Sequence, residues 1–265
     1  ADALDLGKIS VGPPYFALLF VLLMAPLVLL LPFGPLTRWQ REQPSKPFAM
    51  LVPWAGLALG IGIGAFFLAP QGAWKTAAGL AGSAWVLAGT ARFVWTRVQA
   101  KGNRFTAEML GMTLAHVGIA VFLVGALLTE GLSRQRELAL APGQSVELGR
   151  HAFRFDGVVR REGPNYLADR GTVQVSRDGH AITVMHPEKR SYASGGQVMT
   201  ESAIDAGVTR DLYVALGEPL GNGSWAVRVH VKPFVRWIWL GAVLMALGGF
   251  VTATDKRFRR KEPAA

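Results

Sequence analysis

The stretch MLGMTLAHVGIAVFLVGALLT, residues 109–129, decides the fold of this chain. It carries no formal charge between Glu108 and Glu130, and about 20 apolar residues are enough to cross the roughly 30 Å hydrocarbon core of a bilayer. We therefore predict a membrane-spanning helix. His116 lies about 12 Å into this helix, counted from Glu108 at 1.5 Å per residue. An ionisable side chain at that depth costs free energy unless it has a partner, so we predict a functional role for His116.

Helical geometry places four residues on the same face as His116, three or four positions away. Two of them are small, which predicts room for a flat group beside the imidazole. These neighbours are Met112, Thr113, Ile119 and Ala120.

Three roles for His116 follow from its position: haem ligation, a proton relay, or a structural hydrogen bond to a neighbouring helix. A haem needs a planar slot and usually a second axial ligand. The apolar stretches hold no second histidine, and methionines within them, such as Met24, Met112 and Met245, are typical packing residues. If His116 binds haem, we therefore expect the second ligand from a part of the protein beyond this sequence. A relay would need further acidic groups or histidines within the spans, so haem ligation and a structural role are favoured.

The chain as a whole has the composition of an integral membrane protein with a water-facing part. Half of its residues are hydrophobic (51%) and 17% are charged, and there is no cysteine, which excludes disulfides and thiol chemistry. Five stretches are long enough to span a bilayer: residues 15–36, 48–68, 73–95, 109–129 and 235–254. We predict four transmembrane helices in residues 1–129, a fifth in 235–254 and a basic tail in 255–265. Since the sequence begins with Ala1, we expect a fragment or the C-terminal half of a longer protein.

The net charge of +10 invites a nucleic-acid interpretation, but the placement of the charges argues against one. The basic residues gather between the first and second stretches, between the third and fourth, and after the fifth. By the positive-inside rule these segments face the cytoplasm, so residues 130–234 lie on the opposite, external side of the membrane. The residues that carry this argument are Arg38, Arg41 and Lys46; Arg97, Lys101 and Arg104; and Lys256, Arg257, Arg259, Arg260 and Lys261.

Residues 130–234 alternate between apolar and polar side chains, which predicts a small antiparallel β domain of six to eight strands. Asp178-Gly179 is the best hairpin turn, and residues 188–210 lack the pattern, so we predict a long loop with a helical turn there. The alternating apolar residues are Phe153 and Phe155, Val173 and Val175, Ile182 and Val184, Leu212, Val214 and Leu216, and Trp225, Val227, Val229 and Val231.

Four further histidines lie in this domain, and we interpret all four as ordinary surface residues, with contact to a partner or to lipid head groups as the alternative for His230. His151, His180 and His186 fall on or beside predicted exposed strands and turns. His230 shares the polar face of its strand with Arg228 and Lys232.

In the second apolar stretch, glycines recur at positions 56, 60 and 64, a ridge that predicts close packing of another helix.

Several blocks of this sequence resemble the CcmF family, the haem-lyase component of bacterial cytochrome c maturation, and together they extend over nearly the whole chain. They are KISVGPPYF from Lys8, the helix around His116, PEKRSY from Pro187, MTE from Met199, RDLYVALGE from Arg210, and KPFVRWIWLG from Lys232 with Met245 and Gly248-Gly249.

The resemblance implies a bacterial inner-membrane protein that takes haem from the chaperone CcmE. It implies transfer of that haem to the Cys-x-x-Cys-His motif of apocytochrome c, with CcmH-type thiol-handling partners and membrane lipids around it. It also implies a haem b held in the membrane between two histidines, of which His116 matches the second by its helix and surrounding sequence. The family's other haem-contacting histidines and its tryptophan-rich segment have no counterpart in this sequence. A membrane docking module without a haem ligand is the alternative; the lack of other intramembrane charge argues against a transporter fragment.

Overall fold

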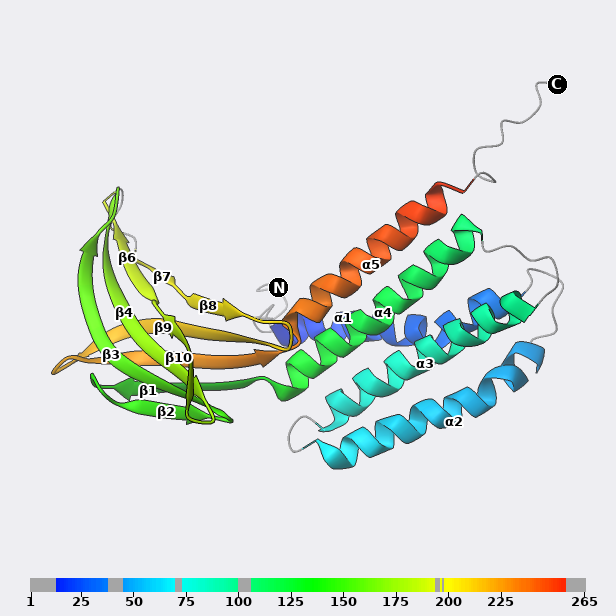
Figure 1. Cartoon of the computed structure of the whole chain (residues 1–265), viewed down its shortest axis with the longest axis horizontal. Coiled ribbons are helices and arrows are strands. Elements are labelled where there is room, and N and C mark those ends of the chain that lie inside the picture. Colours follow the sequence, from blue (N-terminus) through cyan, green and yellow to red (C-terminus); the bar gives the residue numbers. More distant parts are fainter. Residues whose placement is uncertain are drawn as a thin grey trace, which may run out of the picture. The chain divides into compact units, whose positions relative to one another are not determined.

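The computed structural model of this chain describes residues 13–37, 45–69, 73–99, 106–193, 196 and 198–255 (Figure 1). Within them lie five α-helices, a 3-10 helix and ten strands. The chain divides into two compact units. The first comprises residues 1–64, 80–120 and 243–265, and the second comprises residues 65–79 and 121–242, so the boundaries cross the third, fourth and fifth helices.

The helices follow the predicted apolar stretches. They are α1 (Pro13–Leu30), the 3-10 helix η2 (Leu31–Leu36), α2 (Ser45–Leu68), α3 (Ala73–Gln99), α4 (Ala107–Leu132) and α5 (Val235–Ala253). Four of the described segments are long and apolar enough to cross a membrane: Leu18–Leu36, Lys46–Leu68, Ala107–Leu132 and Val235–Ala253. The helix α3 is not among them, since it carries Lys75, Arg92 and Arg97 and many small polar residues. The fifth span therefore stays a prediction, and most of the basic residues on which the orientation depends lie outside the described residues.

Close backbone contact joins α4 and α5 in the first unit, where the two helices run side by side (Figure 1). A Cβ atom added to Gly248 would lie 2.5 Å from the carbonyl oxygen of Gly111 and 2.6 Å from the backbone nitrogen of Ala115. Only a residue without a side chain fits at this crossing. The same unit joins α3 to α4 by a hydrogen bond in which the Ser83 hydroxyl donates to the Ala120 carbonyl at 2.8 Å.

The glycine ridge of α2 does not behave as predicted. A Cβ atom added at Gly56, Gly60 or Gly64 would meet no atom of the described residues within 4 Å. No helix of the described chain therefore packs on this ridge. The prediction failed because the spacing of glycines within one helix does not specify which neighbour, if any, approaches it.

The second unit contains a sandwich of two antiparallel sheets. One has the order β1-β10-β9-β8 and the other β2-β3-β4-β6-β7, with β5 also paired to β4. The strands are β1 (Arg134–Leu140), β2 (Ser145–Leu148), β3 (His151–Glu162), β4 (Tyr166–Arg177), β5 (His180–Met185), β6 (Glu188–Tyr192), β7 (Val198–Glu201), β8 (Ala203–Ala206), β9 (Arg210–Gly221) and β10 (Ser224–Pro233). The described residues thus form more strands than predicted.

The predicted alternation is confirmed for four strands in the core of this sandwich. It is wrong for Ile182 and Val184, which are 40% and 52% exposed, because β5 turns Met185 into the core and so places these two on its opposite face. The fully buried core residues come from four strands: Phe153 and Phe155; Val173 and Val175; Leu212, Val214 and Leu216; and Val227 and Val229. Pairing across strands keeps them on one face, since Val229 lies opposite Val214 and Val227 opposite Leu216. The hairpin turn is also confirmed, because Asp178 and Gly179 both have positive φ values (51° and 82°).

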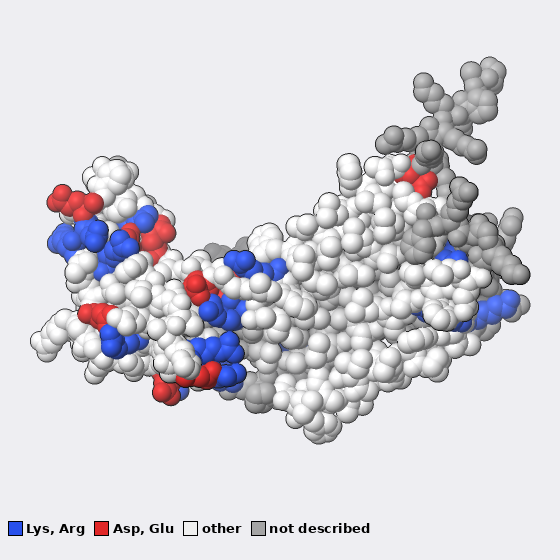
Figure 2. All heavy atoms as spheres, in the orientation of Figure 1, with Lys and Arg blue, Asp and Glu red and all other residues white. Residues whose placement is uncertain are grey.

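The predicted loop over residues 188–210 is wrong, because β6, β7 and β8 lie there. Their apolar residues Val198, Met199 and Ile204 are each about half exposed, and most of their other side chains are polar or charged, so no buried apolar alternation marks these strands. Ion pairs take its place: the Arg190 guanidinium contacts Glu188 within β6 at 2.9 Å and Glu201 of the paired strand β7 at 3.6 Å. Figure 2 shows such charges gathered over the strands, whereas the helices present a mostly uncharged surface.

Within the second unit, hydrogen bonds join the chain segments that lead into and out of the sandwich. The Thr129 hydroxyl, near the end of α4, donates a 2.6 Å hydrogen bond to the carbonyl of Pro233, which precedes α5. The indole N–H of Trp237 donates to the Val208 carbonyl at 3.2 Å. A Cβ atom at Gly125 would lie 2.5 Å from the backbone nitrogen of Ile238, so α4 and α5 also approach closely here.

Candidate functional site

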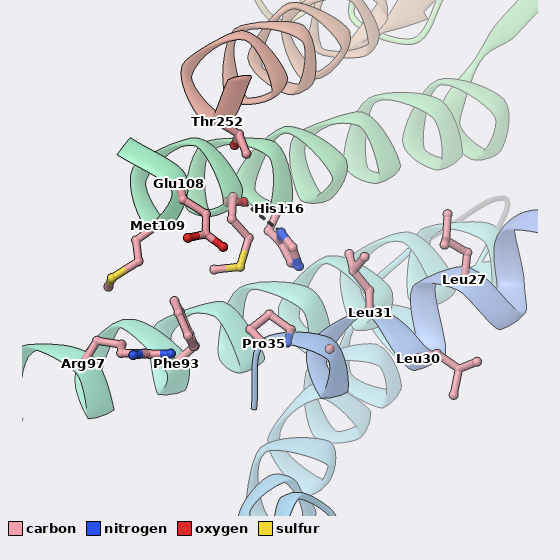
Figure 3. A pocket seen from close by; sticks show the side chains of 12 residues that line it. Leu27, Leu30, Leu31, Pro35, Phe93, Arg97, Glu108, Met109, His116 and Thr252 are labelled. Carbon is pink, nitrogen blue, oxygen red and sulfur yellow. Dashed lines mark hydrogen bonds between the residues drawn. The ribbon is translucent and has the colours of Figure 1, made fainter. Parts of the chain in front are cut away.

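His116 is the ionisable residue that the sequence singles out within a span (Figure 3). One of its ring nitrogens makes a hydrogen bond, and the other makes none with the described residues. Its Nδ1 lies 2.8 Å from the carbonyl oxygen of Met112, one helical turn earlier. A carbonyl oxygen only accepts hydrogen bonds, so Nδ1 carries the proton and donates it. In the neutral imidazole, Nε2 then keeps its lone pair. This Nε2 atom is buried and has no hydrogen-bond partner among the described residues.

A cavity of about 680 Å³ lies within the first unit and has His116 in its wall. That volume is within the range of small-molecule and cofactor sites. Most of the wall is aliphatic or aromatic and comes from α1, η2, α3, α4 and α5 (Figure 3). The lining residues are Leu27, Leu30, Leu31, Gly34, Pro35, Phe93, Arg97, Glu108, Met109, Met112, His116 and Thr252.

The cavity lies on a different side of His116 from the predicted slot. Met109 and Met112 line it together with the imidazole. Ala120, one of the small residues expected beside the slot, is instead 1% exposed, and its carbonyl accepts the hydrogen bond from Ser83 of α3. Thr113 donates its hydroxyl to the Met109 carbonyl at 2.8 Å within the same helix. The prediction that Thr113 and Ala120 border the open space is therefore wrong, because α3 packs against Ala120.

Formal charge is present at one end of the cavity. Arg97 from the last turn of α3 and Glu108 from the first turn of α4 both line it. The Arg97 guanidinium carbon lies 5.3 Å from the centre of the Phe93 ring, a cation–π distance. At the same end, an Asp255 side-chain oxygen accepts a 3.0 Å hydrogen bond from the backbone N–H of Glu108, which caps the start of α4.

The sequence did not identify Arg97 as a site residue, since a basic residue after an apolar stretch is typical of a topology signal. No motif connects Arg97 to His116, because they lie on different helices. The only available signal was the four-residue spacing between Phe93 and Arg97, which places both on one face of α3.

The structure places the other histidines in the sandwich, outside this cavity. The surface assignment is wrong for His151, which is 7% exposed and whose Nε2 has no hydrogen-bond partner in the described part of the chain. Burial lowers the pKa of His151, and Arg210 and Arg177 lower it further. His180 and His186 are exposed, as predicted.

His230 lies on the polar face of β10 as predicted, beside exposed Arg228. Partial burial lowers its pKa, and the charges of Lys232 and Arg228 lower it further. No group of three or more histidine and acidic side chains that could hold a metal ion occurs in the described ranges. The imidazole of His116 is therefore the strongest candidate ligand in this part of the chain.

Comparison with known proteins gives a consistent result. A family model described as the CcmF C-terminal beta-sandwich matches residues 131–233. The chain is 49% identical to cytochrome c-type biogenesis protein CcmF of Pseudomonas aeruginosa, over 98% of this chain and 40% of that protein. It is 42% identical to the Escherichia coli protein of the same name, over 97% of this chain and 40% of that protein.

A solved structure named cytochrome c heme lyase CcmF has the same fold. It matches with a TM-score of 0.76 and 20% sequence identity, over 92% of this chain and 41% of the other chain. This chain thus spans about 40% of the length of the curated relatives it matches.

Proposed function

This chain belongs to the CcmF family of cytochrome c-type biogenesis proteins and corresponds to their C-terminal part. We propose that it serves a cytochrome c haem lyase by supplying His116 as one axial ligand to a haem b in the membrane. The observation that carries the proposal is the His116 ring itself. A buried Nε2 with no hydrogen-bond partner among the described residues, on an imidazole that lines a cavity of cofactor size, suits a haem iron.

The residues around His116 fit this group. The Met112 carbonyl fixes the tautomer and the ring orientation, as second-shell carbonyls do for metal-ligating histidines. The apolar walls from α1 and η2 would exclude water from the macrocycle, which lowers the local dielectric and so tunes the redox potential. When bound, the haem would supply one-electron redox chemistry. A second axial ligand would come from a part of the protein outside this chain, since no other described histidine lines the cavity.

The proposed membrane arrangement is that of a multi-pass inner-membrane protein. Four apolar helices support it. We place the sandwich in the periplasm, the C-terminal tail in the cytoplasm, and α3 across the membrane as a fifth span, because its buried Ser83 and Thr90 make hydrogen bonds to backbone carbonyls. The hydroxyls of Ser83 and Thr90 would thus be satisfied inside the bundle.

The proposed partners are the haem chaperone CcmE, a CcmH-type thiol-handling protein and apocytochrome c. The names of the relatives support a role in cytochrome c biogenesis. The sandwich would provide the docking surface, since charged and aromatic side chains gather on the β4–β6 face: the Arg190 guanidinium lies 4.6 Å from the centre of the Tyr166 ring. Arginine and tyrosine are enriched in protein interfaces.

Replacement of His116 by Ala in the intact protein tests the proposal. We expect the reduced-minus-oxidised spectrum of the membrane haem to disappear and cytochrome c maturation to fall, while membrane insertion stays unchanged. Removing a polar side chain from an apolar span makes insertion easier, so a lost haem could not be attributed to failed insertion. His186→Ala, at an exposed position of the sandwich, is the matched control. Full haem content in His116→Ala would refute the ligand and favour a docking module without a haem ligand of its own.

A further inference from the structure

We propose that Arg97 binds a propionate carboxylate of the haem held by His116, so that the propionate edge lies at the Arg97–Glu108 end of the cavity. This inference rests on the proposed function and goes beyond it. It assigns an anion-binding residue to the site and gives the haem an orientation.

The charge distribution in the cavity supports this orientation. Of the lining residues, only Arg97 carries a permanent positive charge, and the opposite part of the wall is built of leucines from α1. A carboxylate moved from water into an apolar wall costs several kcal/mol unless a cation or hydrogen-bond donors meet it. The end of the cavity at Arg97 is therefore the favourable one for the propionates, and the hydrocarbon edge of the macrocycle fits the end lined by the leucines of α1.

The position of Arg97 along the site also fits. Glu108, at the same end as Arg97, is eight residues from His116 along α4, about 12 Å at 1.5 Å per residue. His116, the proposed iron ligand, is thus separated along the cavity wall from Arg97, the proposed propionate partner. The iron and the propionate carboxylates are likewise separated within one haem. Figure 3 shows His116 and Arg97 on facing helices, with Phe93 beside Arg97.

The guanidinium is held in place and has donors to spare. Its contact with the Phe93 ring restrains the side chain, and Phe93 is itself 4% exposed. Among the residues that the structure describes, no carboxylate forms an ion pair with Arg97. A guanidinium offers five N–H donors in a planar fork that matches a carboxylate in bidentate fashion.

A purely topological role for Arg97 makes a different prediction. A positive-inside residue acts during insertion and is indifferent to the chemistry of the haem edge. Haem whose propionates are esterified keeps the iron and the macrocycle but has lost the carboxylate charge. The propionate proposal therefore predicts that Arg97 matters for haem and not for haem dimethyl ester.

The test compares Arg97→Gln and Arg97→Lys with a control, Arg92→Gln, in the full-length protein purified in detergent. Arg92 lies on the same helix and does not line the cavity. Each variant is stripped of haem and titrated with haem and with haem dimethyl ester, and the midpoint potential is measured. We expect Arg97→Gln to weaken haem binding about ten- to hundredfold, the effect of losing a charge-assisted hydrogen bond. Arg97→Lys should retain part of the affinity, because it keeps the charge and loses the fork.

The midpoint potential should fall in Arg97→Gln, because removing a nearby cation favours the more positive ferric haem. The dimethyl ester should bind the wild type and Arg97→Gln equally. Equal weakening of haem and ester would overturn the proposal and assign Arg97 a structural role. Unchanged haem affinity and potential in Arg97→Gln would also overturn it, while haem loss in His116→Ala would leave the proposed function standing. A wild-type protein that binds neither haem nor ester would refute the proposed function and this orientation together.

Discussion

The contact between α4 and α5 predicts that Gly248 positions His116. In Gly248→Ala, the new Cβ atom would lie 2.5 Å from the Gly111 carbonyl oxygen and 2.9 Å from the Ala115 Cβ atom. Ordinary van der Waals contact begins at 3.4 Å, so the two backbones must separate by about 0.9 Å, the difference between 3.4 and 2.5 Å. The neighbouring atoms belong to backbone or to a Cβ atom, so no flexible side chain can move aside.

A shift of this size is large for a metal ligand, whose distance is set to within about 0.2 Å. Overpacking of this kind costs about 1–3 kcal/mol. If that cost falls on the haem-bound arrangement of α4, haem affinity drops about 5- to 150-fold. We therefore expect the purified Gly248→Ala protein to have lower haem content in its reduced-minus-oxidised spectrum and a lower melting temperature in detergent.

Gly249→Ala is the matched control, because a Cβ atom there meets nothing within 4 Å among the described residues. Alanine is also the better helix former by about 0.8–1.0 kcal/mol, so this variant should be at least as stable as the wild type. The reasoning would be refuted if Gly248→Ala matched Gly249→Ala in haem content and melting temperature. A lower melting temperature with full haem content would place Gly248 in helix packing alone.

Three further predictions concern the sandwich and the topology. Residues 131–233 expressed alone should give a strand-rich circular dichroism spectrum and bind no haem, and Phe153→Ala should lower their free energy of unfolding by about 3–5 kcal/mol, because the side chain is fully buried. Because the pKa of His151 is lowered in the folded domain, the unfolded state binds more protons than the folded state as the pH falls through 6.5. The free energy of unfolding measured by urea titration should therefore decrease over this pH range, and it should decrease less in His151→Phe. A reporter fused after Lys261 should be cytoplasmic, and one inserted near Gly196 periplasmic.

The control for Phe153→Ala uses an exposed position of the same domain. Val184→Ala, at a half-exposed side chain, should change the free energy of unfolding by less than Phe153→Ala. Stoichiometric haem binding by the isolated domain, a pH dependence unaffected by His151→Phe, or reversed reporter locations would each contradict the corresponding prediction.

Several features of this protein follow from the sequence by itself. The run around His116 predicts an apolar helix with a histidine inside it, because membrane thickness sets the length of such a run. The alternation at Phe153 and Phe155, and at Val227 and Val229, predicts strands of an antiparallel β domain with these residues on one face, because successive side chains of a strand point to opposite faces. Both patterns are properties of one element, and both are confirmed in the structure.

Only the tertiary structure decided which side of the His116 helix faces open space. The packing of α3 against Ala120 closes one side, and the cavity along Met112 leaves the other open. Packing likewise brought Arg97 to the wall of that cavity and buried His151. The periodicity of a helix or strand states which residues share a face, but the partner of that face is set by contacts between segments far apart in the chain. Those contacts depend on the shapes of both surfaces, and a pattern within one segment carries information about only one of them.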